Sequence, residues 1–459
     1  ALRQRGIGRE DRIGIVAPIS PEVAIMSMGV IAAATAVHLP PAMPRQGLDA
    51  VIRRLGLRAI AAPAGLADSS RDAAARAGLP FLEFRREGPA GQFRIDGPAA
   101  GPATPGRPAL PEDLATIALS SGTTGMPKLI PRAHRNVTGM AARASRALPL
   151  APGNRSCVLM PYFHHGWVQA IRSVETGGFL SLPGEFDSRA LPVWLAAHRP
   201  DWLFLNPSML AGLVQSLPGD APPAGGALRF VQVAGISLPP PVRAAAAAAL
   251  GARILDCYGS NEAGTVALET PDDPAPPGAV GRITVPVRIV TDAGLPLPAG
   301  ETGLIEVPAS EVTPGYLDDP LATARAFTDD GWFRMGDLGR LSPDGWLSIT
   351  GRADEVINRG GEKIDPYEVE AVLLAHPAVL ECAVFPAPHP VAGQEPAAAI
   401  VLRPGALASG RDLRRWALDR LAPGMVPRRV LFLPSLPRTH SGKIQRHALP
   451  NLLDRGSDS

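Results

Sequence analysis

The first apolar segment of the chain reads RIGIVAP at residues 12–18, and it is followed by PEVAIMSMGVIAAATAV at 21–37 and LRAIAAP at 57–63. The first and third segments are short and apolar, as in strands buried on both faces, and the longer segment between them predicts a buried helix. The same alternation returns as WLFLN at 202–206, LRFVQVAG at 228–235 and ARILDCYG at 252–259. Short buried strands separated by helices are typical of α/β proteins with largely parallel sheets. The sequence therefore predicts an α/β fold.

The sequence changes character twice toward its C-terminal end. From residue 280 it becomes β-rich and punctuated by turns, as in GRITVPVRIVTDAGLPLPAGETGLIEV. A second change follows GRAD at 351–354, after which helix, strand, strand, helix and strand patterns make up an α+β domain of about 100 residues. We therefore predict a large N-terminal domain, residues 1–352, with parallel-rich sheets flanked by helices and a β-rich subdomain. A small α+β C-terminal domain, residues 353–459, completes the predicted organisation.

The composition excludes several classes of protein. Hydrophobic residues make up 46% of the chain and charged residues 19%, which favours a soluble globular enzyme over a disordered chain. The net charge of +2, with scattered arginines, argues against nucleic-acid binding. The most apolar stretch, at 23–37, is shorter than the ~20 residues that cross a bilayer, and the N-terminal segment lacks the apolar core of a signal peptide. We expect a cytoplasmic protein without a membrane span, either a monomer or a homodimer.

Cysteine and lysine are rare, and both scarcities are informative. The cysteines lack the spacing of a zinc site or a disulfide framework; they are Cys157, Cys257 and Cys382. Beside 42 arginines the chain has three lysines, Lys128, Lys363 and Lys443. Because nearly all basic residues of this chain are arginine, a retained lysine indicates a position that needs a compact ammonium group. All three lie in glycine-rich segments, which makes them candidates for functional positions.

The strongest local motif is SSGTTGMPK at residues 120–128, which follows the strand-like segment ATIAL. Its glycines let the backbone approach a polyphosphate, its hydroxyls donate hydrogen bonds, and its lysine supplies positive charge. It is not a Walker A motif, because no GxxxxGK[ST] pattern is present. The predicted phosphate-binding residues are Ser120, Ser121, Gly122, Thr123, Thr124, Gly125 and Lys128.

Further segments follow this loop in a characteristic order: YGSNE at 258–262, GD at 336–337, GRAD at 351–354, GGEKI at 360–364 and PRTHSGKI at 437–444. Together with the loop they resemble the adenylate-forming superfamily, which includes acyl- and aryl-CoA synthetases, peptide-synthetase adenylation domains and luciferases. The resemblance is greatest to acyl- or aryl-acid CoA ligases. It implies that ATP activates a carboxylic acid as an acyl-AMP, that pyrophosphate leaves, and that the acyl group passes to a thiol. The thiol is that of coenzyme A or, alternatively, of the phosphopantetheine arm of an acyl carrier protein.

The resemblance also implies roles for individual residues. Glu262 holds Mg²⁺ and Asn261 faces the α-phosphate, although threonine is commoner at that position. Asp337 accepts the ribose hydroxyls, and Arg352 contacts ribose and phosphate. The implied catalytic residues are Lys443, Glu262, Lys128 and His164. The remaining nucleotide contacts are Gly235, Ile236, Ser237, Cys257, Tyr258, Gly259 and Ser260.

The resemblance implies an acyl pocket and a second half-reaction as well. The implied pocket residues are Tyr162, Phe163, His164, His165, Trp167, Gly235, Gly259 and Ala263. A histidine there gates the thiol, and we favour this over a metal site because neighbouring strand side chains point to opposite faces. The C-terminal domain is implied to be mobile about a hinge at Asp354. Its rotation would bring in a thiol channel formed by Gly360, Gly361, Glu362 and Lys363.

The identity of the acid stays open, because aryl, fatty, polycyclic and small dicarboxylic acids are all compatible with the motifs. Phe163 and Trp167 favour a hydrophobic acid. The segment around His164 is one residue tighter than the usual pattern, and part of the first subdomain is expected to be missing or unusually short at its N-terminal end. A nucleotide-binding regulator without catalytic activity is the alternative from another class, and the intact charged residues argue against it.

Overall fold

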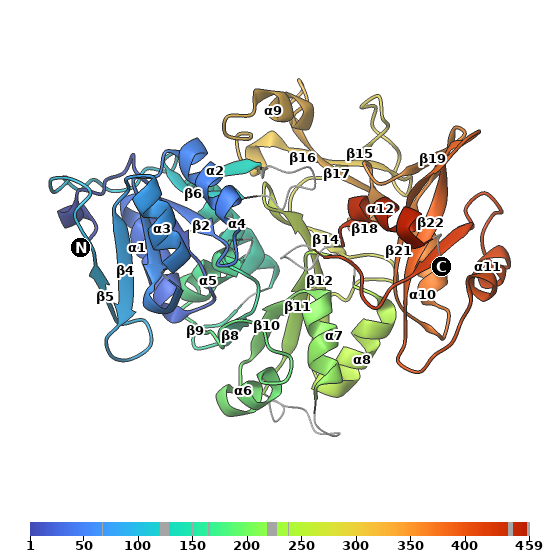
Figure 1. Cartoon of the computed structure of the whole chain (residues 1–459), viewed down its shortest axis with the longest axis horizontal. Helices are drawn as coiled ribbons and strands as arrows, with labels where there is room; N and C mark the ends of the chain where they lie inside the picture. Colours follow the sequence, from blue (N-terminus) through green and yellow to red (C-terminus); the bar gives the residue numbers. More distant parts are fainter. Residues whose placement is uncertain are drawn as a thin grey trace. The chain divides into compact units, whose positions relative to one another are not determined.

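The computed structural model describes residues 1–66, 68–119, 128–148, 150–163, 166–217, 227–236, 238–438 and 444–456. The chain divides into two compact units, whose helices and strands are labelled in Figure 1. Unit 1 comprises Ala1–Pro276, Val280–Pro286 and Val307–Phe333. Unit 2 comprises Pro277–Ala279, Val287–Glu306 and Arg334–Ser459. The domain boundary between residues 352 and 353 stays a prediction.

The first sheet of unit 1 has the strand order β5-β4-β3-β1-β2-β6-β7. Strands β4, β3, β1, β2 and β6 pair in parallel, whereas β5 and β7 run antiparallel at the edges. The strands are β1 (Arg12–Val16), β2 (Thr35–Leu39), β3 (Ala59–Pro63), β4 (Phe81–Arg86), β5 (Phe93–Asp96), β6 (Leu114–Leu119) and β7 (Leu129–Ala133). The helices between and after them are α1 (Pro21–Ala33), α2 (Arg45–Leu55), α3 (Asp68–Arg76), α4 (His134–Ala147) and α5 (Gly166–Glu175).

A second run of strands in unit 1 has the order β14-β13-β12-β11-β10-β8-β9. Strands β9, β8, β10, β11 and β12 pair in parallel, and β13 and β14 continue the sheet in antiparallel pairs. Their bounds are β8 (Arg155–Val158), β9 (Phe179–Ser181), β10 (Trp202–Leu205), β11 (Phe230–Ala234), β12 (Arg253–Ser260), β13 (Gly264–Leu268) and β14 (Gly281–Ile283). The later helices of unit 1 are α6 (Leu191–His198), α7 (Pro207–Gln215), α8 (Pro240–Leu250) and α9 (Pro320–Ala326).

Helix caps and apolar burial explain these elements. The side chain of Ser20 caps α1 and that of Asn206 caps α7, each directly before a proline at the first helical turn. Every residue of β10 is fully buried, as expected for a parallel strand covered on both faces. The helix predicted over residues 21–37 is wrong at its C-terminal end, because α1 stops at Ala33 and residues 35–39 form β2. The apolar run is continuous and buried throughout, so its periodicity does not mark the change.

Unit 2 contains a β-rich part and an α+β part. The first consists of β15 (Arg288–Val290), most of β16 (Gly303–Pro308), most of β17 (Trp332–Leu341) and β18 (Trp346–Arg352), in that order across the sheet. The second has the strand order β20-β19-β22-β21, with β23 paired to β22. Its elements are β19 (Ile357–Arg359), β20 (Glu362–Ile364), α10 (Pro366–Leu374), β21 (Val379–His389), β22 (Gly393–Leu402), α11 (Gly410–Leu418), β23 (Arg429–Phe432) and α12 (Pro450–Gly456). The predicted α/β fold class is confirmed.

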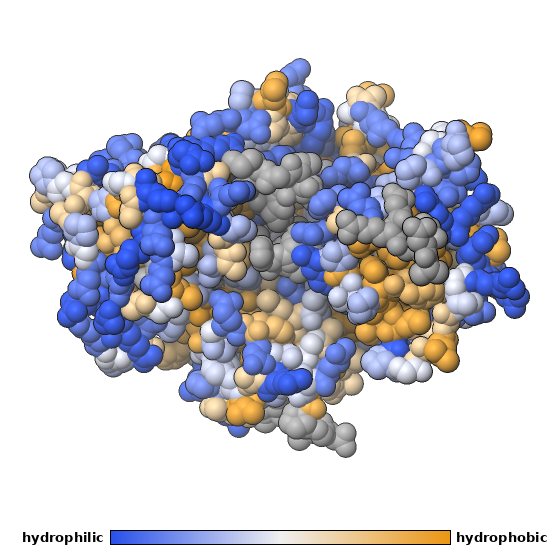
Figure 2. Space-filling model, in the orientation of Figure 1, coloured by the Kyte–Doolittle hydropathy of each residue, from blue (hydrophilic) through white to orange (hydrophobic). Residues whose placement is uncertain are grey.

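The surface, the helices and the cysteines can be compared with the expectations drawn from the composition. Figure 2 shows hydrophilic residues over most of the N-terminal part of unit 1, where charged side chains of α3 are exposed. Among the residues that the structure describes, no helix is both long and apolar enough to span a bilayer. The three cysteines are free and buried.

Candidate functional site

A tight turn between β12 and β13 carries the central residues of the site. The hydroxyl of Ser260 accepts hydrogen bonds from the backbone amides of Glu262 and Ala263, both at 3.2 Å. Gly264 has a φ of +70°, and a Cβ at Gly259 would lie 2.0 Å from the Gly264 carbonyl oxygen. Glycine is therefore required at both ends of the turn, which holds Asn261 and Glu262 between two strands.

Tyr316 connects Glu262 to the lysine at the end of the predicted phosphate loop. Its hydroxyl donates to Oε1 of Glu262 at 2.9 Å, and the Nζ atom of Lys128 lies 4.5 Å from the centre of its ring. Backbone hydrogen bonds fix the segment, from Thr313 N to the Glu262 carbonyl and from Leu317 N to the Leu129 carbonyl. The structure thus brings together two predicted site residues, Lys128 and Glu262, around a tyrosine that the sequence analysis did not single out.

Arg132 of β7 is fully buried. Its guanidinium contacts the same turn at two points, the backbone carbonyl and the side chain of Asn261. Its Nε and Nη2 atoms donate to the backbone carbonyl of Asn261 at 2.9 and 2.7 Å, and Nη2 also donates to Oδ1 of that side chain at 3.0 Å. Burial lowers the pKa of Arg132 to about 10, against the opposing effect of Glu262. The guanidinium therefore stays charged at neutral pH.

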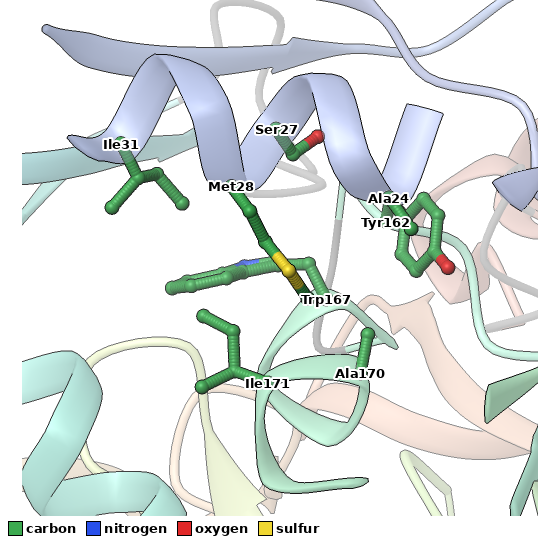
Figure 3. Close-up of a pocket in the computed structure, with 8 residues that line it drawn as sticks. All are labelled: Ala24, Ser27, Met28, Ile31, Tyr162, Trp167, Ala170 and Ile171. Atoms are coloured by element: carbon green, nitrogen blue, oxygen red, sulfur yellow. The ribbon is translucent and has the colours of Figure 1, made fainter. Parts of the chain in front are cut away.

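The predicted pocket residues Tyr162 and Trp167 lie in the first hydrophobic core of unit 1. Trp167 stacks on His38 with ring centres 5.9 Å apart, and the guanidinium of Arg132 lies 5.5 Å from its ring centre. Figure 3 shows the indole between side chains of α1 and of α5, where it lines a small apolar hollow with Met28 and Ile171. Burial, followed by the charge of Arg132, lowers the pKa of His38 to about 3.

Two of the predicted nucleotide-binding segments meet at the carboxyl ends of neighbouring strands in the second sheet. Strands β11 and β12 are parallel, with Ala234 opposite Cys257. Gly235, which has a φ of +102°, follows the carboxyl end of β11, and Tyr258 lies beside it near the carboxyl end of β12, the usual place for ligands in α/β sheets. Cys257 of β12 is buried, and burial raises the pKa of its thiol to about 11, so the thiol is neutral.

Unit 2 brings three of the predicted site residues together, Asp337, Arg352 and Asp354. Asp337 and Arg352 are directly opposite each other in the β17–β18 pair. The Nη1 atom of Arg352 donates to Asp337 at 2.9 Å, and its Nε atom donates to Asp354 at 3.0 Å. Burial by itself would lower the pKa of Arg352, but the two carboxylates raise it above its ordinary value. These residues form a charged cluster between the β-rich part and the predicted hinge.

The predicted thiol channel lies in the β19–β20 hairpin. Gly360 and Gly361 have φ values of +59° and +96°, and Glu362 and Lys363 are exposed. Lys363 forms an exposed ion pair with Asp292, which contributes little to stability. Several predicted residues lie outside the described residues: Ser120, Ser121, Gly122, Thr123, Thr124, Gly125, His164, His165, Ser237 and Lys443.

Comparison with protein families settles the classification. The model of the AMP-binding enzyme family matches residues 1–317, and that of the AMP-binding enzyme C-terminal domain matches residues 368–443. The chain belongs to the AMP-binding enzyme family. The resemblance inferred from the motifs is therefore confirmed, and so is the enzyme class, an AMP-forming acid–thiol ligase.

Individual relatives of this family member are CoA ligases. A sulfoacetate–CoA ligase of Cupriavidus necator is 36% identical over 358 residues, which cover 77% of this chain and 69% of that protein. An oxalate–CoA ligase of Saccharomyces cerevisiae is 32% identical over 75% of this chain and 64% of its own length. The chain thus spans about two thirds of these curated relatives. The ATP-bound crystal structure of MatB from Rhodopseudomonas palustris has a TM-score of 0.87 at 26% identity, covering 98% of this chain and 90% of that one.

Two residues of this AMP-binding enzyme were missed by the sequence analysis. Tyr316 is one of four tyrosines in the chain and follows a Pro-Gly pair, which marks a turn and gives no sign of a partner. Arg132 interrupts an apolar strand, LIPRA, and a charged residue in a buried strand is the signal that could have found it. Their partners, Glu262 and Asn261, are distant in the sequence, so only the fold joins them.

Proposed function

We propose that this AMP-forming ligase activates a small acid that carries a second anionic group, of the sulfoacetate or oxalate type, and transfers it to coenzyme A. The two CoA ligases described above act on acids of this kind. The burial of Tyr162 and Trp167 supports the proposal, because these aromatic residues pack into the core. This packing argues against the hydrophobic acid that the sequence favoured.

The observation that carries the chemistry is the grouping of Lys128, Arg132, Asn261 and Glu262 around one turn. In the first half-reaction a carboxylate oxygen forms a bond to the α-phosphorus of ATP, and the bond to the bridging oxygen breaks as pyrophosphate leaves. Negative charge on the phosphoryl oxygens must be stabilised, and positioned cations and N–H donors do this. In the second half-reaction a thiolate sulfur attacks the acyl carbonyl, and AMP leaves.

Glu262 fits the role of a magnesium ligand. Mg²⁺ in nucleotide sites takes one or two protein carboxylates and completes its shell with phosphate oxygens and water. Tyr316 occupies Oε1 of Glu262, and Oε2 accepts no hydrogen bond from a described residue. The described residues contain no group of three or more histidine, cysteine or acidic side chains that could hold a metal alone. A bound Mg²⁺ would neutralise phosphate charge, and Glu262 would orient it.

The roles of the unit 2 residues are part of the same proposal. Asp337 would accept hydrogen bonds from the ribose hydroxyls, and Arg352 would contact the ribose and the phosphate. The ion pair between them supports this assignment, because it holds the carboxylate in a fixed orientation. Asp354 would act as the hinge, Lys443 would bind the carboxylate and α-phosphate during adenylation, and the thiol would enter beside Gly360 and Gly361.

A substrate panel tests the proposed function. Acid-dependent pyrophosphate release is measured with sulfoacetate, oxalate, malonate, benzoates and fatty acids, and the product with coenzyme A is identified by mass spectrometry. We expect the highest kcat/KM for a small, doubly anionic acid and a thioester of coenzyme A. A higher kcat/KM for an aromatic or fatty acid would overturn the substrate assignment. Faster transfer to a loaded carrier protein than to coenzyme A would overturn the acceptor.

Replacement of Glu262 tests the chemistry of the turn. Glu262→Gln should lower acid-dependent pyrophosphate release by roughly 10²- to 10³-fold, the usual cost of one transition-state charge contact. The matched control is Glu87→Gln, which changes an exposed glutamate of unit 1 and should leave the rate unchanged. A Glu262→Gln enzyme within threefold of the wild type would remove this residue from the mechanism.

A further inference from the structure

We propose that Arg132 is a positioning residue that fixes the side-chain amide of Asn261, so that its NH2 group and not its oxygen faces the reacting phosphate. The proposal rests on the proposed function, in which Asn261 faces the α-phosphate. It adds to that function a residue on a different strand, which acts on the substrate only through Asn261.

The argument begins with the chemistry of the pair. A guanidinium group has N–H donors and no acceptor, so only the oxygen of an amide can bind it. The Nη2 atom of Arg132 lies 3.0 Å from the Asn261 side chain. The partner therefore decides which end of the amide faces the arginine, a choice that an asparagine in water leaves open. With Oδ1 held by Arg132, Nδ2 is directed away from it.

The second step concerns the other end of the amide. Asn261 is half-buried, and its Nδ2 atom donates to none of the residues that the structure describes. It lies in the turn next to Glu262, the proposed magnesium ligand. A flipped amide would set its NH2 group against the guanidinium and present an oxygen to the phosphate, so both contacts would be repulsive. Arg132 excludes this arrangement.

The third step concerns charge. Arg132 is fully buried, yet it makes no ion pair with the described residues, and its Nη1 atom has no hydrogen-bond partner among them. Its described hydrogen bonds go to neutral oxygens of Asn261. The charge of Glu262 offsets part of this charge without contacting the guanidinium. Because no described residue in direct contact neutralises it, the guanidinium still contributes a positive field beside the Asn261 amide. That field favours an anion at the position the Asn261 amide faces.

A purely structural role makes a different prediction, and Arg143 provides the comparison. Arg143 of α4 donates to the backbone carbonyl of Ala263 at 2.7 Å and pairs with Glu311. It supports the same turn without contacting the side chain of Asn261. If Arg132 only supported the backbone, removing either arginine would have effects independent of the side chain at position 261.

The test combines Arg132→Met with Asn261→Thr. A threonine hydroxyl rotates and both donates and accepts, so it needs no partner to orient it. In the presence of Asn261, we expect Arg132→Met to lower kcat/KM for ATP in acid-dependent pyrophosphate release by about 10- to 50-fold. In the Asn261→Thr background the same change should cost about threefold or less, because the hydroxyl reorients freely. Arg143→Met should cost the same factor in both backgrounds.

Two further variants guard against misfolding. Arg132→Lys keeps a cation that has N–H donors and no acceptor, so it can still bind only Oδ1 of Asn261 and should recover about threefold or more of the activity that Arg132→Met loses. Asn261→Asp keeps the contact with Arg132 but has no N–H donor, so activity should fall more than about tenfold at an unchanged melting temperature. An equal cost of Arg132→Met in both backgrounds would overturn the proposal, as would the same coupling for Arg143→Met. If neither the wild type nor Asn261→Thr releases pyrophosphate with any acid, the proposed function is wrong and the positioning role falls with it.

Discussion

Arg132 of unit 1 is fully buried and Arg446 of unit 2 is largely buried, with 12% of its side chain exposed, and the two guanidinium groups have opposite kinds of partner. Arg132 in unit 1 is hydrogen-bonded to neutral oxygens of Asn261. Arg446 in unit 2 donates to both carboxylate oxygens of Glu370 at 2.7 and 2.9 Å and lies 3.1 Å from the carboxylate of Glu355. Burial lowers the pKa of Arg132 to about 10. The carboxylates of unit 2 overcome the effect of burial and raise the pKa of Arg446.

The partners of the two arginines decide whether the charge of each is neutralised within the fold or remains available to a ligand. The Arg446 cluster is closed, because Tyr367 also donates to Glu355 and the backbone amide of Val384 donates to Glu370. A neutralised cluster of this kind fixes the fold around it. The charge of Arg132 has no such partner in contact among the described residues, so the anions of the reaction can use it. The same residue type therefore serves stability in unit 2 and recognition in unit 1.

The largest expected effect is on the stability of unit 2. Arg446→Met leaves the buried carboxylate of Glu370 without its cation, which should lower the free energy of unfolding by about 3–5 kcal/mol. Urea denaturation followed by tryptophan fluorescence measures this loss. The double variant Arg446→Met with Glu370→Leu removes both charges and should recover more than half of it. A loss below about 1 kcal/mol for the single variant would contradict the closed-cluster interpretation.

A smaller loss of stability is expected at low pH, because His38 of unit 1 resists protonation in the folded protein. Its pKa in the folded protein is about 3, because of burial and then of Arg132, against ~6.5 in an unfolded chain. The unfolded state therefore binds a proton first as the pH falls below about 6.5. Stability is complete above that pH and should decrease by about 2 kcal/mol between about pH 7 and pH 5.

Denaturation of the wild type and of His38→Gln at about pH 5, 6 and 7 isolates this contribution. The difference between their stabilities should change with pH by the stated amount. Arg132→Met should raise the pKa of His38, as followed by NMR of its ring, because one of the two causes is removed. Parallel pH profiles of the two proteins would show that His38 does not titrate in this way.

The sequence predicted those parts of the molecule in which neighbouring residues carry the information. The strands at 12–16 and 59–63 follow from local apolar runs. The scarcity of lysine identified Lys128, which the structure places on the ring of Tyr316. The change from α1 to β2 was missed, because helix and strand are both apolar there and the pattern has no boundary.

Residues that act through distant partners could not be predicted in this way. Arg132 contacts a turn 129 positions away, and Tyr316 contacts Glu262 at a separation of 54. Nothing in the local sequence states that β7, the turn after β12 and the segment before α9 converge. The motif order predicted the family and several site residues, whereas the residues that orient them required the fold.

The smallest effect is expected when the neutral hydroxyl of Tyr316, which binds Glu262 in unit 1, is removed. Tyr316→Phe keeps the ring under Lys128 and loses one hydrogen bond to Glu262, which is worth about 1 kcal/mol. We expect a rise of about two- to fivefold in the KM for ATP, measured by pyrophosphate release, and an almost unchanged melting temperature. The control in unit 2 is Tyr367→Phe, which removes the bond to Glu355 within the closed cluster. That variant should lower the melting temperature instead, because the hydroxyl there donates to the carboxylate of a partly buried ion pair. A loss of about 100-fold or more in Tyr316→Phe would mean that the hydroxyl contacts the substrate itself, and the division between orienting and neutralising partners would then fail in unit 1.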